Sequence, residues 1–272
     1  LFRQTQLLKV SNPLYCGRSC LNMEQKLTLH IDRSSGKKKA QVHCVIIGFS
    51  DYKNDKEKII FDKNNANIAN NINPYLVDAP NITVERRSTP ICGAPEMNKG
   101  SEPTDGGFLL LNEVEKEELI NENPVAQKWI RPFLGAKEFL NGGKKWCLWL
   151  VDVNPSEIRK CKLIMERLDN VRKLRLESKA ESTRKASNIP TLFKDIRQPN
   201  SRYLIIPEIS SEKRKYIPMD FAEKHIISSN KLQLIPNATI YEFGVLESSI
   251  HMAWTRAVCG RLKSDYIYSG TV

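Results

Sequence analysis

Short runs of consecutive apolar residues, separated by polar segments, mark the strands that the sequence predicts. Residues 42–49, 145–151, 203–207 and 231–236 each combine β-branched, aromatic or aliphatic side chains over the length of a strand. Such runs between turn residues are typical of strands buried on both faces. Residues 58–61 form a further run, which follows the first one after a polar turn. We predict that residues 42–49 and 58–61 pair as a hairpin.

Two longer segments show helical spacing instead. Between residue 156 and about residue 187, apolar side chains recur every three or four positions, at Ile158, Cys161, Ile164, Leu168, Val171 and Leu174. This spacing predicts one long helix with a single apolar stripe. Residues 238–260 predict a second helix, and Asn112 with the acids after it predicts the capped start of a shorter one. Strands and helices together indicate a mixed α/β fold.

A change in composition between residues 64 and 80 predicts where one domain ends. This segment is rich in Asn and Ala and contains Pro74 and Pro80. Such residues are typical of irregular connections between domains. We therefore divide the chain into residues 1–64 and residues 65–272.

The charge of the chain indicates the kind of partner. Lys and Arg outnumber Asp and Glu by 42 to 31, which leaves a formal net charge of +11, and the predicted helix over residues 156–187 concentrates the excess. Nucleic acid is the commonest polyanionic partner, although an anionic membrane face or an acidic protein suits the same sign. No apolar run approaches the ~18 residues needed to cross a bilayer. We expect no membrane partner.

Seven cysteines are scattered along the chain, and their pattern favours neither disulfides nor zinc. Their odd number and the apolar stretches around four of them fit thiols in a reducing cytoplasm, which is the location we expect. Cys16 and Cys20 lie close together, but no second Cys pair or His array completes a tetrahedral site. We predict no metal.

The sequence contains no complete catalytic or cofactor-binding motif. Residues 12–15, Asn-Pro-Leu-Tyr, are similar to the Asn-Pro-Pro-Tyr loop with which amino-methyltransferases hold a flipped adenine, but the second proline is missing. No nucleophile elbow or phosphate-binding glycine loop is recognisable either. We predict no catalytic residue and no bound cofactor in this chain.

The segment over residues 210–216, between two predicted strands, has side chains suited to reading bases. The Glu212 carboxylate can accept from cytosine N4, and the Arg214 guanidinium can donate two hydrogen bonds to guanine O6 and N7. Lys213 and Lys215 beside them would contact phosphates. A solvated turn often has the same composition, so the local sequence leaves both interpretations open.

A series of short blocks follows one another along the chain, at residues 42–49, 103–107, 129–135, 146–150, 197–199, 209–212, 216–218, 251–256 and 259–266. In content and order these blocks resemble one family, the MmeI-like adenine-specific DNA methyltransferases of restriction-modification systems. They cover about residues 40–272. The resemblance implies a remnant of the methyltransferase sheet, in which the predicted hairpin supplies the last strands, followed by an α+β target-recognition domain with a long basic helix.

The resemblance also implies an activity to which this chain contributes only part. The family methylates adenine N6 in a short DNA site with S-adenosylmethionine, often with a nuclease on the same chain, and both activities lie N-terminal to the strand at residues 42–49. Here the S-adenosylmethionine-binding glycine motif and an intact Asn-Pro-Pro-aromatic loop are absent, and residues 1–38 do not match the family pattern. We therefore expect that this chain alone does not methylate DNA.

The expected partners are double-stranded DNA and the methyltransferase core. By the resemblance, Glu212 and Arg214 read bases, and Ala180 and Tyr216 shape the neighbouring base contact. Charge and helix position alone give the phosphate candidates, which are Arg172, Arg175, Lys179, Arg184, Lys213 and Lys215. Two alternatives remain, namely a generic nucleic-acid or polyanion-binding module that reads no base, and an inert truncated remnant.

Overall fold

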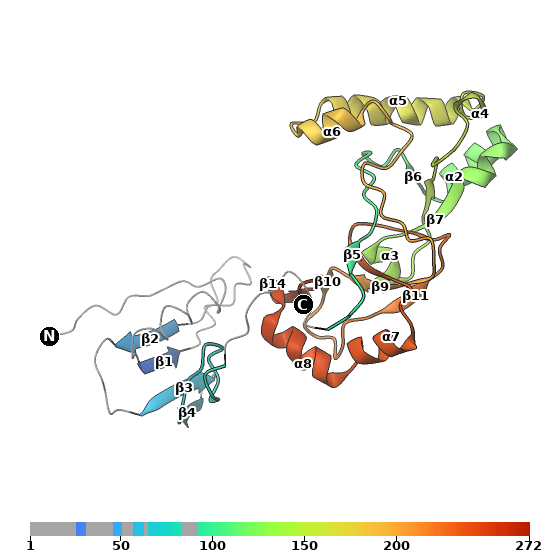
Figure 1. The fold of residues 1–272 in the computed structure, drawn as a ribbon. Coiled ribbons are helices and arrows are strands. Elements are labelled where there is room, and N and C mark those ends of the chain that lie inside the picture. Colours follow the sequence, from blue (N-terminus) through green and yellow to red (C-terminus); the bar gives the residue numbers. More distant parts are fainter. Residues whose placement is uncertain (1–25, 31–45, 51–56, 63–64, 83–91) are drawn as a thin grey trace. The chain divides into compact units, whose positions relative to one another are not determined.

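The computed structural model describes residues 26–30, 46–50, 57–62, 65–82 and 92–272. The chain folds into two compact units. The first unit contains residues 1–89, 256–266 and 271, and the second contains residues 90–255, 267–270 and 272. The two units are described separately below (Figure 1).

The first unit contains a sheet in the strand order β2-β1-β3-β4. β1 (Lys26–His30) pairs antiparallel with β2 (Ile46–Ser50) and meets β3 (Lys58–Asp62) in parallel. The later part of the predicted strand at residues 42–49 is therefore confirmed, and residues 42–45 lie outside the described residues. The predicted hairpin between this strand and residues 58–61 is wrong, because β1 lies between β2 and β3.

The predicted domain boundary falls inside a hairpin of this sheet. β4 (Asn65–Ala69) pairs antiparallel with β3 from Asp62↔Asn65 to Lys58↔Ala69. A boundary between residues 64 and 65 would separate these two strands, whereas the compact unit runs on to Thr89. Further along the chain, β14 (Gly260–Leu262) pairs with β15 (Asp265–Ile267).

One sheet of the second unit has the strand order β11-β9-β13-β5. β9 (Tyr203–Pro207) and β13 (Leu232–Pro236) pair antiparallel, which confirms two of the predicted strands. β11 (Asp220–Ala222) and β5 (Asn98–Lys99) lie at the sides, and β10 (Ile209–Ser210) follows β9. The buried side chains of this sheet form a core with α3 (Ala136–Asn141) packed against it. This sheet, α3, α7 (Ile240–Leu246) and α8 (Ser249–Val258) are called the strand subdomain.

The other sheet of the second unit has the order β12-β7-β8-β6. Its strands are β6 (Leu110–Leu111), β7 (Ile130–Leu134), β8 (Trp146–Leu148) and β12 (Ile227–Ser228). α2 (Glu113–Glu122) and the 3-10 helix η1 (Pro124–Trp129) join β6 to β7. The predicted capped start of α2 is confirmed, because Asn112 and Glu115 form a capping box. This sheet, α2, η1 and the three helices within residues 155–186, α4 (Pro155–Ile158), α5 (Lys162–Leu176) and α6 (Glu181–Ala186), are called the helical subdomain.

The predicted long helix is three helices. They are α4 (Pro155–Ile158), α5 (Lys162–Leu176) and α6 (Glu181–Ala186). The backbone is extended at Cys161 and at Ala180, which precede α5 and α6. The predicted apolar stripe of α5 is confirmed at Ile164, Leu168 and Val171, which are buried in the core of the helical subdomain. It is wrong at Leu174, whose relative exposure is 36%.

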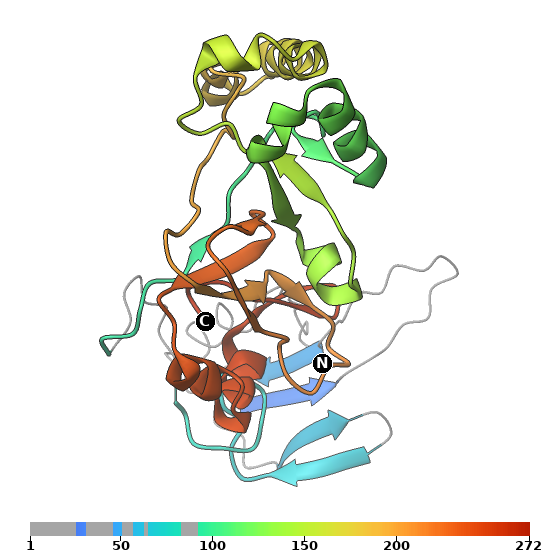
Figure 2. The same ribbon diagram turned by 90° about the vertical axis from the view of Figure 1, so that its right-hand side faces the viewer.

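The predicted helix over residues 238–260 is also divided. α7 (Ile240–Leu246) begins with a capping box between Thr239 and Glu242, and α8 (Ser249–Val258) follows it. Phe243 of α7 packs on Phe221 of β11 with the ring centroids 5.9 Å apart, which fixes α7 to the sheet. In Figures 1 and 2, α4 to α6 lie at one end of the second unit and α7 and α8 at the other. None of the described helices is long and apolar enough to cross a membrane.

Candidate nucleic-acid interface

A cationic surface lies on α5, on α6 and on the turn between them. Arg172, Lys179 and Arg184 are exposed there, as the sequence predicts for phosphate contacts. The Arg184 Nη1 donates to the Ser178 and Lys179 carbonyls, at 2.8 Å each, and so supports the turn that leads into α6. Within the described residues, no hydrogen bond or ion pair involves the Arg184 Nε or Nη2. These three predicted phosphate candidates lie on α5, on α6 and on the turn between them, and this surface is called the α5–α6 face.

Arg175 is a correction to that prediction. Its relative exposure is 0%, so it cannot contact a phosphate at the surface. All five guanidinium donors are used by carbonyls: Nε donates to Thr104, Nη1 to Ala186 and Ile189, and Nη2 to Pro103 and Leu192, over 2.8 to 3.2 Å. Burial lowers the pKa of Arg175, and the nearby Asp105 carboxylate opposes that shift.

The buried guanidinium fixes two loops to α5. One is the segment at Pro103 and Thr104 before β6, and the other runs from Ala186 to Leu192 after α6. Because a planar guanidinium offers its donors in fixed directions, it can join carbonyls from several segments at once. Arg175 thereby positions the α5–α6 face without being part of it.

A second polar surface lies on the β10–β11 loop, residues 211–219. Ser210 and Ile217 at its two ends are buried, with relative exposures of 1% and 2%. Between them Glu212, Lys213 and Lys215 are exposed, and Arg214 and Tyr216 are partly exposed. The loop is held at both ends while it presents the predicted base-reading and phosphate-binding side chains.

Turn contacts keep this loop compact. The Arg214 amide donates to the Ser211 carbonyl at 3.1 Å, which closes a tight turn around Glu212 and Lys213. The Lys215 Nζ lies 5.4 Å from the centre of the Tyr216 ring. Neighbouring residues of the sequence therefore project from a single small turn.

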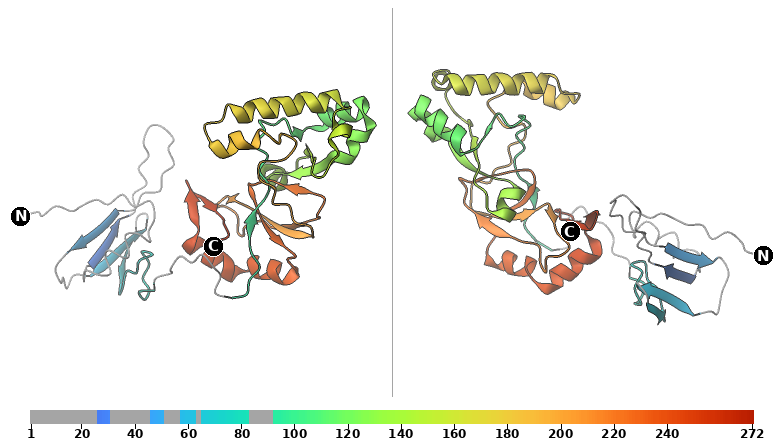
Figure 3. Two further views of the ribbon diagram at one scale, coloured as in Figure 1. Left: turned by 45° about the horizontal axis from the view of Figure 1, so that its top comes forward. Right: turned by 180° about the vertical axis from the view of Figure 1, so that it is seen from behind.

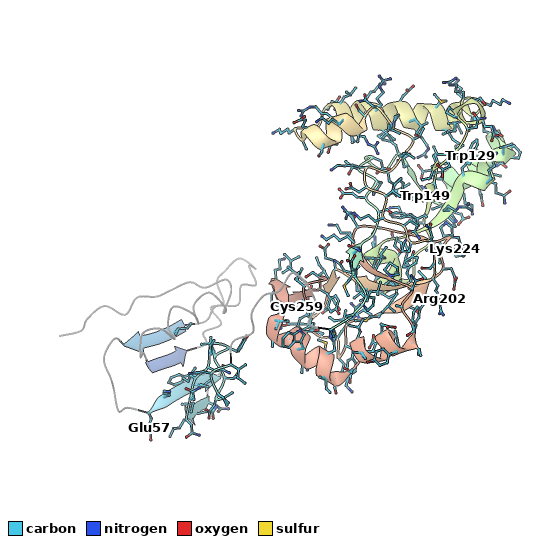
Figure 4. The ribbon with its side chains drawn as sticks, viewed as in Figure 1. Glu57, Trp129, Trp149, Arg202, Lys224 and Cys259 are labelled. Atoms are coloured by element: carbon cyan, nitrogen blue, oxygen red, sulfur yellow. The ribbon has the colours of Figure 1, made fainter. Side chains whose placement is uncertain are left out.

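The structure places the predicted site residues in two groups. Ala180, Lys179, Arg172 and Arg184 belong to the helical subdomain, whereas residues 212–216 belong to the strand subdomain. Figure 3 shows the β9–β13 sheet separated from α5 and α6 in both of its views. Figure 4 labels Trp129 and Trp149 in the helical subdomain and Arg202 and Lys224 in the strand subdomain. Ala180, predicted to shape the neighbouring base contact, is thus on a different surface from Tyr216.

Sequence reasoning missed one cation that the structure brings beside Arg172. Arg159, directly after α4, lines the same cavity as Arg172 of α5. In the sequence Arg159 is one of several basic residues in a segment that also contains acidic and apolar residues. Its only signal is the Asn154-Pro155 helix start, which predicts a short helix ending close to it.

The described ranges contain no group of three or more His, Cys, Asp or Glu side chains placed to hold a metal ion. Cys16 and Cys20 and the segment at residues 12–15 lie outside them. Cys161 is buried, and burial together with its hydrogen bond to Glu122 raises the pKa of its thiol to about 11. This thiol is therefore an unreactive part of the core.

These features define a class, a mixed α/β domain that presents cationic side chains on helices and on a loop between strands. Residues 78–272 match the family described as "MmeI, target recognition domain", and the chain belongs to this family. It is 38% identical over 236 residues to DNA methyltransferase A of Bacillus subtilis (strain 168), across 87% of this chain and 27% of that protein.

A solved structure shows the same fold. The chain is similar, with a TM-score of 0.82 and 40% identity, to the type IIL restriction-modification enzyme MmeI, whose structure was determined in complex with DNA. The match covers 93% of this chain and 35% of that one. This chain thus spans roughly a third or less of the length of these relatives.

Proposed function

We propose that this chain recognises a short sequence in duplex DNA for a site-specific, adenine-N6 DNA methyltransferase of a restriction-modification system. The likeness to MmeI, which extends over 93% of this chain, is the observation that carries the proposal. The target recognition domain family supports it, and so do the exposed cations of the α5–α6 face. A net charge of +11 favours association with a polyanion.

Base reading belongs to the β10–β11 loop in this proposal. Glu212 and Arg214 have the acceptor and donor groups that distinguish cytosine and guanine in the major groove. Their loop is anchored by the buried Ser210 and Ile217, so it can present them in a defined orientation. Tyr216 shapes the contact beside them, whereas Ala180, at the start of α6 in the helical subdomain, is not part of this contact.

Phosphate binding is distributed over both subdomains. The candidates that the structure leaves at the surface are Arg172, Lys179, Arg184, Lys213 and Lys215. Lysine and arginine side chains on phosphates set the register of a protein on DNA and make binding depend steeply on salt. Arg175 acts only through the position of α6.

Methyl transfer is assigned to the remainder of the methyltransferase, which is also the proposed protein partner. S-adenosylmethionine supplies the methyl group in such enzymes, but the sequence of this chain has no glycine-rich loop suited to hold it. The contribution of this chain is to position the DNA from which the target adenine is flipped.

Selection of bound duplexes from a random-sequence DNA library tests the proposal. The 272-residue chain would be used at about physiological salt, where nonspecific contacts are weak. We expect enrichment of one short motif. Binding without enrichment would instead support a polyanion-binding module, and absence of binding at low salt would support an inert remnant.

A further inference from the structure

A cavity of about 300 Å³ lies in the helical subdomain. It is formed by the end of α4, one side of α5 and the segment that follows α6. Arg159, Arg172 and Asn188 represent these three stretches in its lining, although they are far apart in the sequence. The fold therefore assembles one concave site from three separate segments.

Both guanidinium groups at this cavity are available to a ligand. Arg159 and Arg172 are exposed, and within the described part of the chain neither side chain makes a hydrogen bond or an ion pair. Two other arginines of α5 are occupied: Arg167 pairs with Glu115 at 2.6 Å, and Arg175 donates to five carbonyls. The two arginines at the cavity are thus not engaged in the contacts that stabilise the fold.

Apart from the Asp169 carboxylate, the rest of the lining is apolar at its floor and neutral at its rim. Ile158 and Leu168 are buried, with relative exposures of 3% and 4%. Asn188 and Thr191 add neutral polar groups at the rim. A cationic mouth over an apolar floor suits a ligand with an anionic group attached to an apolar one.

We propose that this cavity binds one phosphodiester of the DNA backbone. Arg159 and Arg172 donate to the two non-bridging phosphate oxygens from either side, and the floor at Ile158 and Leu168 contacts the adjoining deoxyribose. Charge-assisted hydrogen bonds of this kind are short and strong. The inference rests on the proposed function, because it names a site at which the DNA backbone is bound. It adds Arg159 to the interface.

Asp169 provides a test of the proposal that is opposite in sign to the test of the two arginines. Its carboxylate lines the same cavity, one turn before Arg172 in α5, and makes no hydrogen bond or ion pair within the described residues. It would repel a phosphate, so the cavity holds two positive charges and one negative charge. Removing this carboxylate should strengthen the binding of an anion.

Equilibrium binding of a mixed-sequence DNA duplex at several salt concentrations tests the cavity. We expect Arg159→Ala and Arg172→Ala each to weaken binding by about tenfold and to lower the slope of log K against log salt by about 1. Asp169→Asn should tighten binding several-fold. Lys160→Ala and Lys173→Ala are the matched controls, because each removes one exposed positive charge next to a cavity arginine and neither lysine lines the cavity.

The outcomes separate the cavity from the proposed function. If the wild-type chain binds DNA and the arginine variants lose no more affinity than the lysine controls, the cavity is not a phosphate site and DNA recognition still stands. If Asp169→Asn leaves the affinity unchanged, the proposed phosphate position is wrong. If the wild-type chain binds no DNA at low salt, both proposals fail.

A methylphosphonate scan of the selected duplex gives an independent readout. Replacing one phosphate by a neutral methylphosphonate should weaken DNA binding by the wild-type chain at a single position of the duplex. The same replacement should leave the affinity of the Arg159→Ala, Arg172→Ala double variant unchanged. Insensitivity at the same position in the Lys160→Ala, Lys173→Ala double variant would overturn the assignment, because it would show a general charge effect. Thermal unfolding of each variant checks that the exposed substitutions leave the fold intact.

Discussion

Arg172 and Arg175 are three residues apart on one helix, yet one faces solvent and the other is fully buried. Charge alone predicts the same role for both. Position distinguishes them, because Arg175 continues the series Ile164, Leu168, Val171 at steps of three or four residues and so lies on the buried stripe. The carbonyls that accept its hydrogen bonds come from residues 103–104 and 186–192, and no local pattern shows that they meet.

Replacing Arg175 by methionine should destabilise the second unit by about 3–5 kcal/mol, because five carbonyls lose the donor that joins them to α5. Urea unfolding followed by tryptophan fluorescence measures this, since Trp129 and Trp149 lie in the affected core. Arg172→Met is the control and should change the free energy of unfolding by less than about 0.5 kcal/mol. Equal effects of the two substitutions would contradict the buried role of Arg175.

The exchange of charges in the β10–β11 loop tests base reading at single residues. Glu212→Lys combined with Arg214→Asp should change the preferred base at one position of the selected motif, while nonspecific affinity stays nearly constant because the net charge of the pair is unchanged. Repeating the library selection with the double variant measures this. A uniform loss of binding, with the motif unchanged, would argue against the assignment.

At the scale of elements, local sequence patterns predict the helix starts and the strands that depend on adjacent residues. The capping box of α2 and the buried strands β9 and β13 follow from adjacent residues, and they are present as predicted. The break before α5 was not predictable, because Glu122 of α2 accepts hydrogen bonds from the Leu163 amide at 3.2 Å and from the Cys161 thiol at 2.9 Å. A cap supplied from another helix gives no signal near the break.

Glu122→Ala should therefore destabilise the second unit by about 1 kcal/mol through the loss of this cap. Urea unfolding again measures the change. Glu118→Ala, an exposed change on the same helix with no such contact, should have an effect close to zero. If both variants have the same stability, the start of α5 does not depend on Glu122.

The order of the strands in a sheet likewise depends on pairing partners that the local sequence does not indicate. β1 separates β2 from β3. Leu27 and Leu29 of β1 alternate with polar residues, which is a strand pattern, but this pattern does not show which strands pair with β1. For the same reason the hairpin of β3 and β4 crosses the predicted boundary at residue 64.

At the scale of the whole molecule, the excess of positive charge determines how binding depends on salt. Six surface candidates, Arg159, Arg172, Lys179, Arg184, Lys213 and Lys215, predict a slope of log K against log salt of roughly −5 to −6. Fluorescence anisotropy of a labelled duplex between low and physiological salt measures this slope. A value near −1 would show that most of these side chains do not reach phosphates.

The anchored β10–β11 loop has a consequence for how such a protein can change over generations. Ser210 and Ile217 are buried, whereas the side chains from Glu212 to Lys215 contribute little to the core. Substitutions between the anchors therefore leave the fold nearly untouched, because exposed positions tolerate change at small cost in stability. A lineage can try new side chains there and acquire a new preferred site without first losing a folded protein.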